Sequence, residues 1–97
     1  MSKIPDRSRA MMKLNDMVRK TTIDGEIVLL DGKSGAYFGL NEVGSRMLEL
    51  SLLHDDREAV LGALLGEFEA DEATIRKNLA ELLDTLLAKE LIVDHEA

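Results

Sequence analysis

Residues 29–41 read LLDGKSGAYFGLN, and the local structure of this stretch sets the fold. An apolar run passes through a glycine turn at residues 32–35 into a second run that carries Tyr37 and Phe38, two of the three aromatic residues. Asn41 follows, and asparagine favours helix starts because its side-chain oxygen accepts an unpaired backbone N–H of the first turn. The stretch therefore predicts a strand, a tight turn, a short aromatic strand and the beginning of a helix.

The sequence before this stretch completes a small sheet. Residues 18–22 favour β structure, and residues 26–31 are rich in the β-branched and apolar types that suit a pleated surface. Asp24-Gly25 joins them as a two-residue turn, since glycine adopts positive φ and aspartate tolerates it. Together with residues 36–40, these segments predict an antiparallel meander of three strands.

Alternation along the third predicted strand assigns its faces. Ala36, Phe38 and Leu40 share one face, whereas Tyr37 and Gly39 share the other. We expect this short strand to lie at an edge of the sheet. An edge strand offers unpaired backbone groups that an extended peptide can complete, and Tyr37 adds a large amphipathic ring.

The C-terminal half predicts three helices. Asn41, Asp55 and Asp71 stand at their starts, and Asp55 has Glu58 three residues later as in a capping box. Apolar residues recur at helical spacing; they are Val43, Met47 and Leu50, then Val60, Leu61, Leu64, Leu65 and Phe68, then Ile75, Leu79, Leu82 and Leu86. Leu83 and Leu87 widen the last stripe to about 140°, more than a surface helix of so small a domain needs. The predicted fold class is α+β, a three-stranded antiparallel sheet followed by three helices, similar to a winged helix.

Composition fits one small domain. Of the 97 residues, 45% are apolar and 32% are charged. We expect a flexible N-terminal arm over residues 1–17, the domain over residues 18–93 with a β-like end at 91–93, and a tail over residues 94–97. There are no cysteines and no run of about 20 apolar residues, which predicts a cytoplasmic chain without a membrane span.

The sequence lacks the signatures of catalysis, of metal binding and of phosphate binding. His54 and His95 have neither a nucleophile nearby nor the spacing of metal ligands. The glycines at 32, 35 and 39 do not form a phosphate loop, because they lack a GK[ST] ending and the GxGxxG spacing. The sequence therefore predicts a protein that is not an enzyme and has no catalytic, cofactor or metal site.

Charge argues against nucleic acid as the partner. The formal net charge is −7. The predicted third helix carries Arg76, Lys77 and Lys89 against Asp71, Glu72, Glu81, Asp84 and Glu90. A helix that reads DNA needs a basic face, so a winged-helix regulator is the weakest interpretation. A peptide-binding module fits better, and a structural module that forms a homodimer through the same strand edge is the alternative. We expect a monomer or a weak homodimer.

Taken together, these motifs make the sequence resemble the PqqD-like family, the elements that recognise precursors of ribosomally synthesised, modified peptides. The resemblance covers about residues 18–93. It rests on LLD at 29–31, Gly-x-Tyr-Phe at 35–38, Leu-Asn at 40–41 with Val43-Gly44 after it, the turn at 68–71, and Leu82, Leu83, Leu86 and Leu91. These motifs look most like those of the stand-alone lasso-peptide members, called B1 proteins. Asn78 stands where many members carry an acidic residue, and Glu90 stands where the family usually has glycine.

The resemblance implies a function as well as a fold. A PqqD-like adapter binds the leader of a precursor peptide as an added strand and presents the precursor to a separate maturation protease. The implied binding residues lie on the third strand and the third helix: Ala36, Tyr37, Phe38, Gly39, Ile75, Asn78, Leu79, Leu82 and Leu86.

Overall fold

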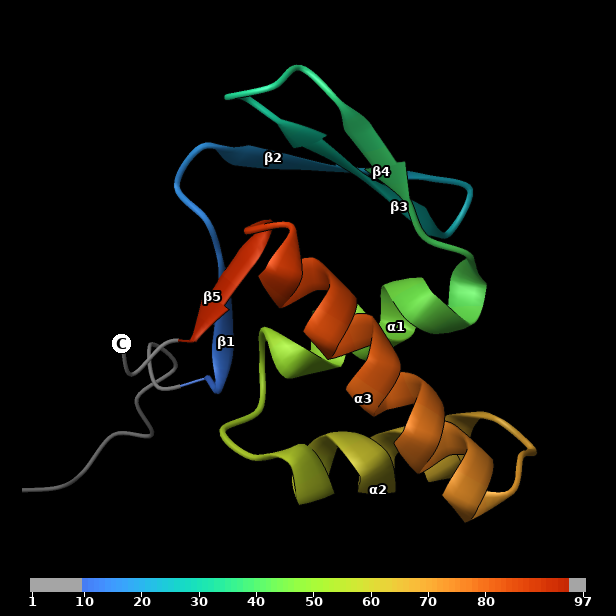
Figure 1. Cartoon of the computed structure of the whole chain (residues 1–97). Coiled ribbons are helices and arrows are strands. Elements are labelled where there is room, and N and C mark those ends of the chain that lie inside the picture. The colour runs from blue at the N-terminus through green and yellow to red at the C-terminus, as the bar shows by residue number, and fades with distance from the viewer. Residues whose placement is uncertain (1–9, 95–97) are drawn as a thin grey trace, which may run out of the picture.

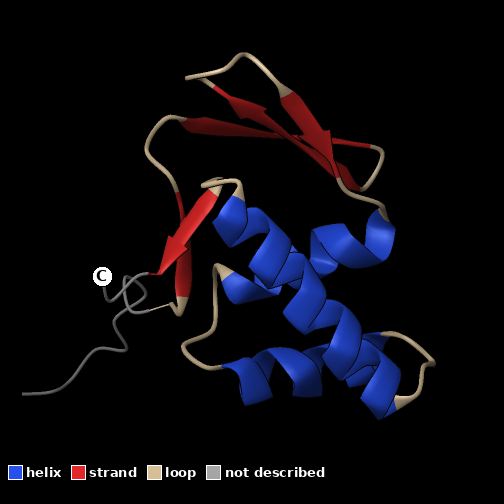
Figure 2. Cartoon of the chain, viewed as in Figure 1, coloured by secondary structure: helices blue, strands red, loops and turns tan. Residues whose placement is uncertain are grey.

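The computed structural model describes residues 10–94, which form two layers (Figure 1). The strands are β1 (Met12–Leu14), β2 (Val18–Ile23), β3 (Glu26–Asp31), β4 (Tyr37–Gly39) and β5 (Ile92–Asp94), and the helices are α1 (Glu42–Ser51), α2 (Arg57–Glu67) and α3 (Glu72–Ala88). The sheet β2-β3-β4 lies over the helical layer, with the C-terminal part of α3 approaching it (Figure 2). The predicted α+β fold, a three-stranded antiparallel sheet followed by three helices, is confirmed.

The sheet is a meander whose turns follow the sequence signals. Asp24 and Gly25 have φ angles of 54° and 82°, so the β2–β3 turn uses positive φ at both central residues, as type I′ hairpins require. In the β3–β4 turn, the Asp31 carboxylate accepts hydrogen bonds from the Lys33 N–H and the Ser34 hydroxyl, each at 3.0 Å. Strand order is β2-β3-β4, so β2 and β4 are the two edges of this sheet.

The core lies between the inner face of the sheet and the helices. Ile27 and Leu29 on β3 are completely buried. They pack in one cluster with buried leucines from each helix, among them Leu48, Leu64 and Leu83. Burying side chains of this kind contributes roughly 1.5–3 kcal/mol each. The sheet is therefore held to the helical layer chiefly through its central strand.

Side-chain caps fix where the helices begin. Asn41 accepts a hydrogen bond from Gly44 N–H at 2.8 Å, and Asp71 accepts one from Thr74 N–H at 3.1 Å. For α2 the prediction of Asp55 as the cap is wrong. The cap is Asp56, whose carboxylate accepts from the N–H three residues on, at Ala59, as the capping geometry requires.

The end of α3 determines how the chain leaves the helix. Leu91 N–H donates to the Leu86 carbonyl at 2.9 Å and Glu90 N–H donates to the Leu87 carbonyl at 3.0 Å, the bond pair of a Schellman motif. The motif places Glu90 at a φ of 60°, where glycine is favoured. The helix therefore ends as a glycine-capped helix does, although the residue is glutamate.

One part of the predicted flexible arm is ordered. Residues Met12–Leu14 form β1 and pair antiparallel with β5, with Met12 opposite Asp94 and Leu14 opposite Ile92. Met12 is buried, because this pairing places it in the core cluster. The prediction of a flexible arm is therefore wrong for these residues, whereas residues 1–9 of the arm and residues 95–97 of the tail lie outside the described residues.

Candidate peptide-binding site

The open edge of β4 is the first component of the site. Leu40 N–H donates to the Ile27 carbonyl, and the Ala36 carbonyl accepts from Asp31 N–H, so these groups point toward β3. Because backbone groups alternate in direction along an antiparallel strand, the N–H and C=O groups of Tyr37 and Gly39 point away from β3. A Cβ added at Gly39 would meet nothing within 4 Å, so the edge is open at this residue. Within residues 10–94 these outward groups have no strand partner, so the strand offers donors and acceptors in the register of a sheet.

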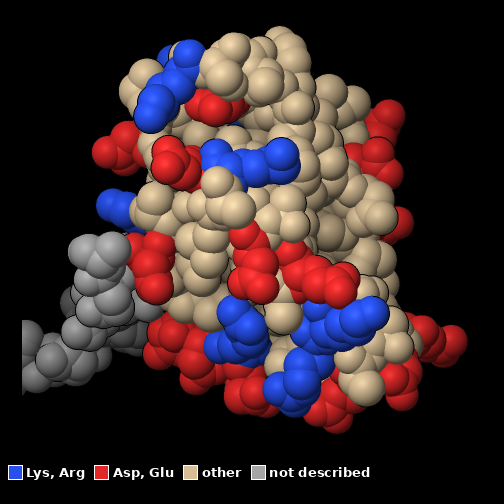
Figure 3. All heavy atoms as spheres, in the orientation of Figure 1, with Lys and Arg blue, Asp and Glu red and all other residues tan. Residues whose placement is uncertain are grey.

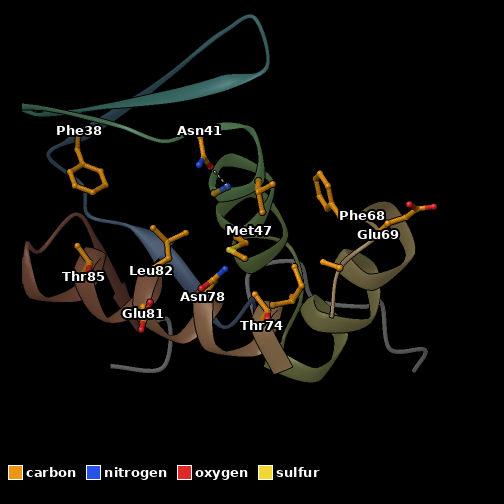
Figure 4. Close-up of a pocket in the computed structure, with 14 residues that line it drawn as sticks. Phe38, Asn41, Met47, Phe68, Glu69, Thr74, Asn78, Glu81, Leu82 and Thr85 are labelled. Atoms are coloured by element: carbon orange, nitrogen blue, oxygen red, sulfur yellow. Dashed lines mark hydrogen bonds between the residues drawn. The ribbon is translucent and has the colours of Figure 1, made fainter. Parts of the chain in front are cut away.

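A groove of about 680 Å³ lies beside this edge, between β4, the start of α1 and one face of α3 (Figure 4). Figure 4 shows Phe38 above Leu82 and Thr85, with Phe68 at the far end. The lining residues are Phe38, Asn41, Val43, Gly44, Met47, Phe68, Glu69, Ala70, Thr74, Ile75, Asn78, Glu81, Leu82 and Thr85. Eight of the fourteen lining residues are apolar or glycine and six are polar or charged, so the groove joins apolar surface to polar groups, as ligand sites do.

The helical wall uses one stripe of α3. Asn78, Leu82 and Thr85 recur at the spacing of one helix face and line the groove, and Ile75 contributes although it is only 3% exposed. Leu79 and Leu86, also predicted for this wall, are completely buried in the core instead. They lie on the neighbouring stripe, which packs in the core with the other helices and β5, so they do not line the groove.

A smaller cavity of about 240 Å³ adjoins the other end of β4. It is lined by Asp31, Ser34, Ala36, Tyr37, Phe38, Lys89 and Leu91. The Lys89 ammonium lies 5.7 Å from the centroid of the Phe38 ring, within the range of a cation–π contact. Phe38 lines both cavities, so the two adjoin at this residue, beside β4 and the C-terminal end of α3, and together they are called the path along β4.

The two aromatic side chains of β4 have different surroundings. Phe38 is half-buried and packs against the core cluster, on the same face as Leu29. Tyr37 is 72% exposed, and alternation places its ring on the outer face of the sheet. The Tyr37 ring therefore does not form the wall that faces α3, and what this residue offers along the edge is its backbone.

Ser45 fixes the position of β4 over the helices. Its buried hydroxyl accepts a hydrogen bond from Ile27 N–H at 2.7 Å and donates one to the Leu40 carbonyl at 3.2 Å. These bonds join α1 to β3 and to the end of β4. The groove therefore has a defined width where β4 runs into α1.

Charge is distributed unevenly around the path. Residues 41–94 contain five basic and thirteen acidic residues, whereas residues 18–40 contain three of each. In Figure 3, acidic side chains lie over the helical part together with several basic ones, and uncharged surface is more extensive at the end of the molecule that holds the sheet. Glu69 and Glu81 line the larger cavity, and Lys89 lines the smaller one. Lys33 N–H, aided by the Ser34 hydroxyl, lowers the pKa of Asp31 through hydrogen bonds to its carboxylate.

Sequence reasoning missed part of the site. The missed residues are Asn41, Val43, Gly44, Met47, Phe68, Glu69, Ala70, Thr74, Glu81, Thr85 and Lys89, with Leu91 and the β3–β4 turn at the smaller cavity. Helical spacing from Leu82 would have found Thr85 and Lys89, because residues three and seven positions on share its stripe. The start of α1 and the turn before α3 carry no such signal, since tertiary packing alone brings them to the groove.

Neither a metal cluster nor a membrane span is found among the described residues, 10–94. No group of three or more His, Cys, Asp or Glu side chains in that range has the arrangement to hold a metal ion. Within the same range, no helix is both long enough and apolar enough to cross a membrane.

Comparison with known proteins gives one family and two similar structures. The family model described as coenzyme PQQ synthesis protein D (PqqD) matches residues 26–92. TbiB1 in complex with the TbiA(beta) leader peptide is 38% identical with a TM-score of 0.73, over 82% of this chain and 93% of that one. Lasso peptide synthetase B1 complexed with the leader peptide is 26% identical with a TM-score of 0.75, over 87% of this chain and 99% of that one. No curated protein matches the chain.

Proposed function

The chain belongs to the PqqD family, and on that basis we propose that it is a non-catalytic adapter that binds the leader of a ribosomally made precursor peptide. The observation that carries the proposal is the open edge of β4 beside an apolar groove. Both similar structures described above were solved with a leader peptide bound, which supports this assignment of the ligand class. One of them is a lasso peptide synthetase B1, which favours a lasso-peptide precursor as the source of the leader.

The binding mode that fits this geometry is strand addition. The leader pairs with the outward backbone groups of Tyr37 and Gly39 and becomes a fourth strand of the sheet β2-β3-β4. Alternate side chains of the leader then enter the groove, where they meet Phe38, Leu82 and Thr85. Backbone pairing supplies affinity for any extended segment, and the groove supplies selectivity.

The adapter presents the bound precursor to a maturation protease, which removes the leader. This step extends the proposal from binding to delivery. It is tested by measuring leader removal by the protease encoded beside this gene, with and without the adapter. Equal cleavage rates in both reactions would contradict delivery while leaving leader binding intact.

The reading frames beside this gene are first searched for a short precursor, and fluorescence polarisation with its labelled leader then tests leader binding. We expect saturable binding with a stoichiometry of one leader per chain. Sedimentation of the same samples separates the adapter from the alternative of a structural homodimer. A tight dimer that persists in excess leader, with no change in polarisation, would contradict the adapter.

A further inference from the structure

We propose that the path along β4 selects leader segments by the order in which their basic and acidic residues follow one another, an inference that rests on the proposed function. The selected segment carries a basic side chain, then an apolar side chain two residues later, then an acidic side chain a further two residues on, from N- to C-terminus. Glu81 meets the basic residue and Lys89 meets the acidic one. These two residues therefore act as specificity determinants at opposite ends of the path.

The positions of Glu81 and Lys89 relative to β4 set the order of the charges. Glu81 lines the larger cavity together with Phe38 and Asn41, at the end where β4 runs into α1. Lys89 lines the smaller cavity together with Ala36 and Tyr37, at the beginning of β4. A guest strand that follows the edge thus passes an acidic group at one end and a basic group at the other.

Spacing along α3 sets the distance between the two charges. Glu81 and Lys89 are eight residues apart, so the helical rise separates them by about 12 Å. A strand advances about 3.3 Å per residue, so about four strand residues cover the same distance. Residues four apart in a strand point to the same face, and both charges therefore point toward α3.

The middle of the path is apolar. Phe38 and Leu82 line it, and Figure 4 shows them on opposite sides of the groove. The guest residue midway between the two charges shares their face, because it is two residues from each. An apolar side chain at this place removes its surface from water against both residues.

Antiparallel pairing sets the direction. Both existing strand pairs in this sheet are antiparallel, and antiparallel pairing is slightly more stable per residue than parallel pairing. A guest antiparallel to β4 begins beside Asn41 and ends beside Ala36. Its N-terminal charge therefore lies near Glu81 and its C-terminal charge near Lys89.

The other charged groups along the path leave this pattern unchanged. Glu69 lines the larger cavity and adds to its negative potential. Lys77 lies 3.8 Å from the Glu81 carboxylate, but both side chains are more than half exposed, so this pair is weak. Asp31 lines the smaller cavity, and its carboxylate is turned into its own loop by the hydrogen bonds from Lys33 and Ser34.

The test uses two labelled leaders of identical composition. One is the leader of the precursor encoded beside this gene, and the other has its paired basic and acidic residues exchanged. At low ionic strength we expect the natural leader to bind about three- to tenfold tighter, with a smaller ratio in high salt, as for partly exposed charge pairs. The double variant Glu81→Lys/Lys89→Glu should reverse the preference.

Two further variants control for folding and for net charge. Asp84→Lys/Lys13→Glu makes the same exchange of charges at exposed positions that line neither cavity, and it should keep the natural preference. Lys89→Gln removes the charge without placing a negative group at the C-terminus of α3, and it should reduce the preference without reversing it.

Three results would overturn the inference. If both leaders bind the wild-type protein equally, the order of charges has no role, although the proposed leader binding is not contradicted. A natural leader that binds but lacks a basic and an acidic residue four positions apart would likewise contradict the charge order alone. If neither leader binds saturably, the proposed function fails as well.

Discussion

The two edges of the sheet β2-β3-β4 resemble one another in their backbones and differ in what lies beside them. On β4, the N–H and C=O groups of Tyr37 and Gly39 point outward, and on β2 alternation directs those of Lys20 and Thr22 outward. The β2 edge is longer and its residues beyond Val18 are exposed. The β4 edge adjoins a groove with an apolar wall, whereas no residue of β2 lines either of the two cavities described above.

Unpaired backbone groups alone therefore do not make a peptide site. A bare edge of polar and basic residues such as Arg19 and Lys20 is of the kind that proteins use to discourage strand pairing. An edge becomes selective when a second element faces the side chains of the guest. In this fold that element is the stripe of α3 that contains Asn78, Leu82 and Thr85.

Removing the apolar wall should weaken leader binding most. Leu82→Asp places a carboxylate in the groove and should weaken leader binding about 10- to 100-fold, because the side chain faces the guest at the centre of the path. Fluorescence polarisation measures the change. Leu53→Asp is the matched control, since Leu53 is 56% exposed and lines neither cavity along β4, and it should bind as wild type does. Equal losses in the two variants would remove α3 from the site.

The next largest effect is expected at Ser45, whose hydroxyl joins α1 to β3 and to the end of β4. Ser45→Ala leaves the Ile27 N–H and the Leu40 carbonyl without their buried partner, which should lower the free energy of unfolding by about 1–3 kcal/mol. Ser51 is the other buried serine of α1, and its hydroxyl has no hydrogen-bond partner among the described residues. Ser51→Ala removes a buried hydroxyl that has no partner, so it should raise the free energy of unfolding and not lower it. Urea denaturation compares the two variants, and similar losses would refute the role given to Ser45.

A proline on each edge tests the backbone groups themselves. Gly39→Pro deletes an outward N–H and should weaken leader binding about tenfold, since it removes one strand hydrogen bond and adds bulk at the edge. Lys20→Pro deletes an outward N–H on β2, and the leader should bind this variant with unchanged affinity. Both variants retain the bonds to β3, so circular dichroism should show the wild-type fold. A loss confined to Lys20→Pro would move the site to the other edge.

A smaller effect is expected at the C-terminal end of α3, where Glu90 has a positive φ. Glu90→Gly relieves a non-glycine residue at a φ of 60° in the helix-ending motif, and it should raise the free energy of unfolding by about 0.5–1 kcal/mol. Thermal and urea unfolding measure this gain. Leader affinity should stay the same because Glu90 lines neither cavity. A destabilised variant would show that the glutamate side chain makes a contribution that outweighs the backbone strain.

Local signals explain which parts of the molecule the sequence predicts. The Asp24-Gly25 turn and the caps at Asn41 and Asp71 act within a few residues of themselves, and each lies where the sequence places it. The pairing of β1 with β5 joins residues about 80 positions apart, as Met12 opposite Asp94 shows. No local pattern predicts a three-residue strand whose partner is at the other end of the chain.

The candidate site shows the same limit. Phe38 and Leu82 follow from strand alternation and helical spacing, and both line the groove. Leu79 and Leu86 fit the same apolar band of α3, but periodicity does not say which part of a wide band faces the core and which faces the groove. Helical spacing places Lys89 on the stripe of Leu82, but its position beside Phe38 depends on how α3 crosses the sheet, which no local pattern predicts.

Amide hydrogen exchange, resolved by residue, shows which edge of the sheet receives the leader. The protein is compared with and without the leader of the precursor encoded beside its gene. Strand addition on β4 predicts that bound leader slows exchange of the Tyr37 and Gly39 amides while those of Lys20 and Thr22 exchange as before. Protection of the β2 amides instead, or bound leader with no protection on either edge, would contradict strand addition on β4.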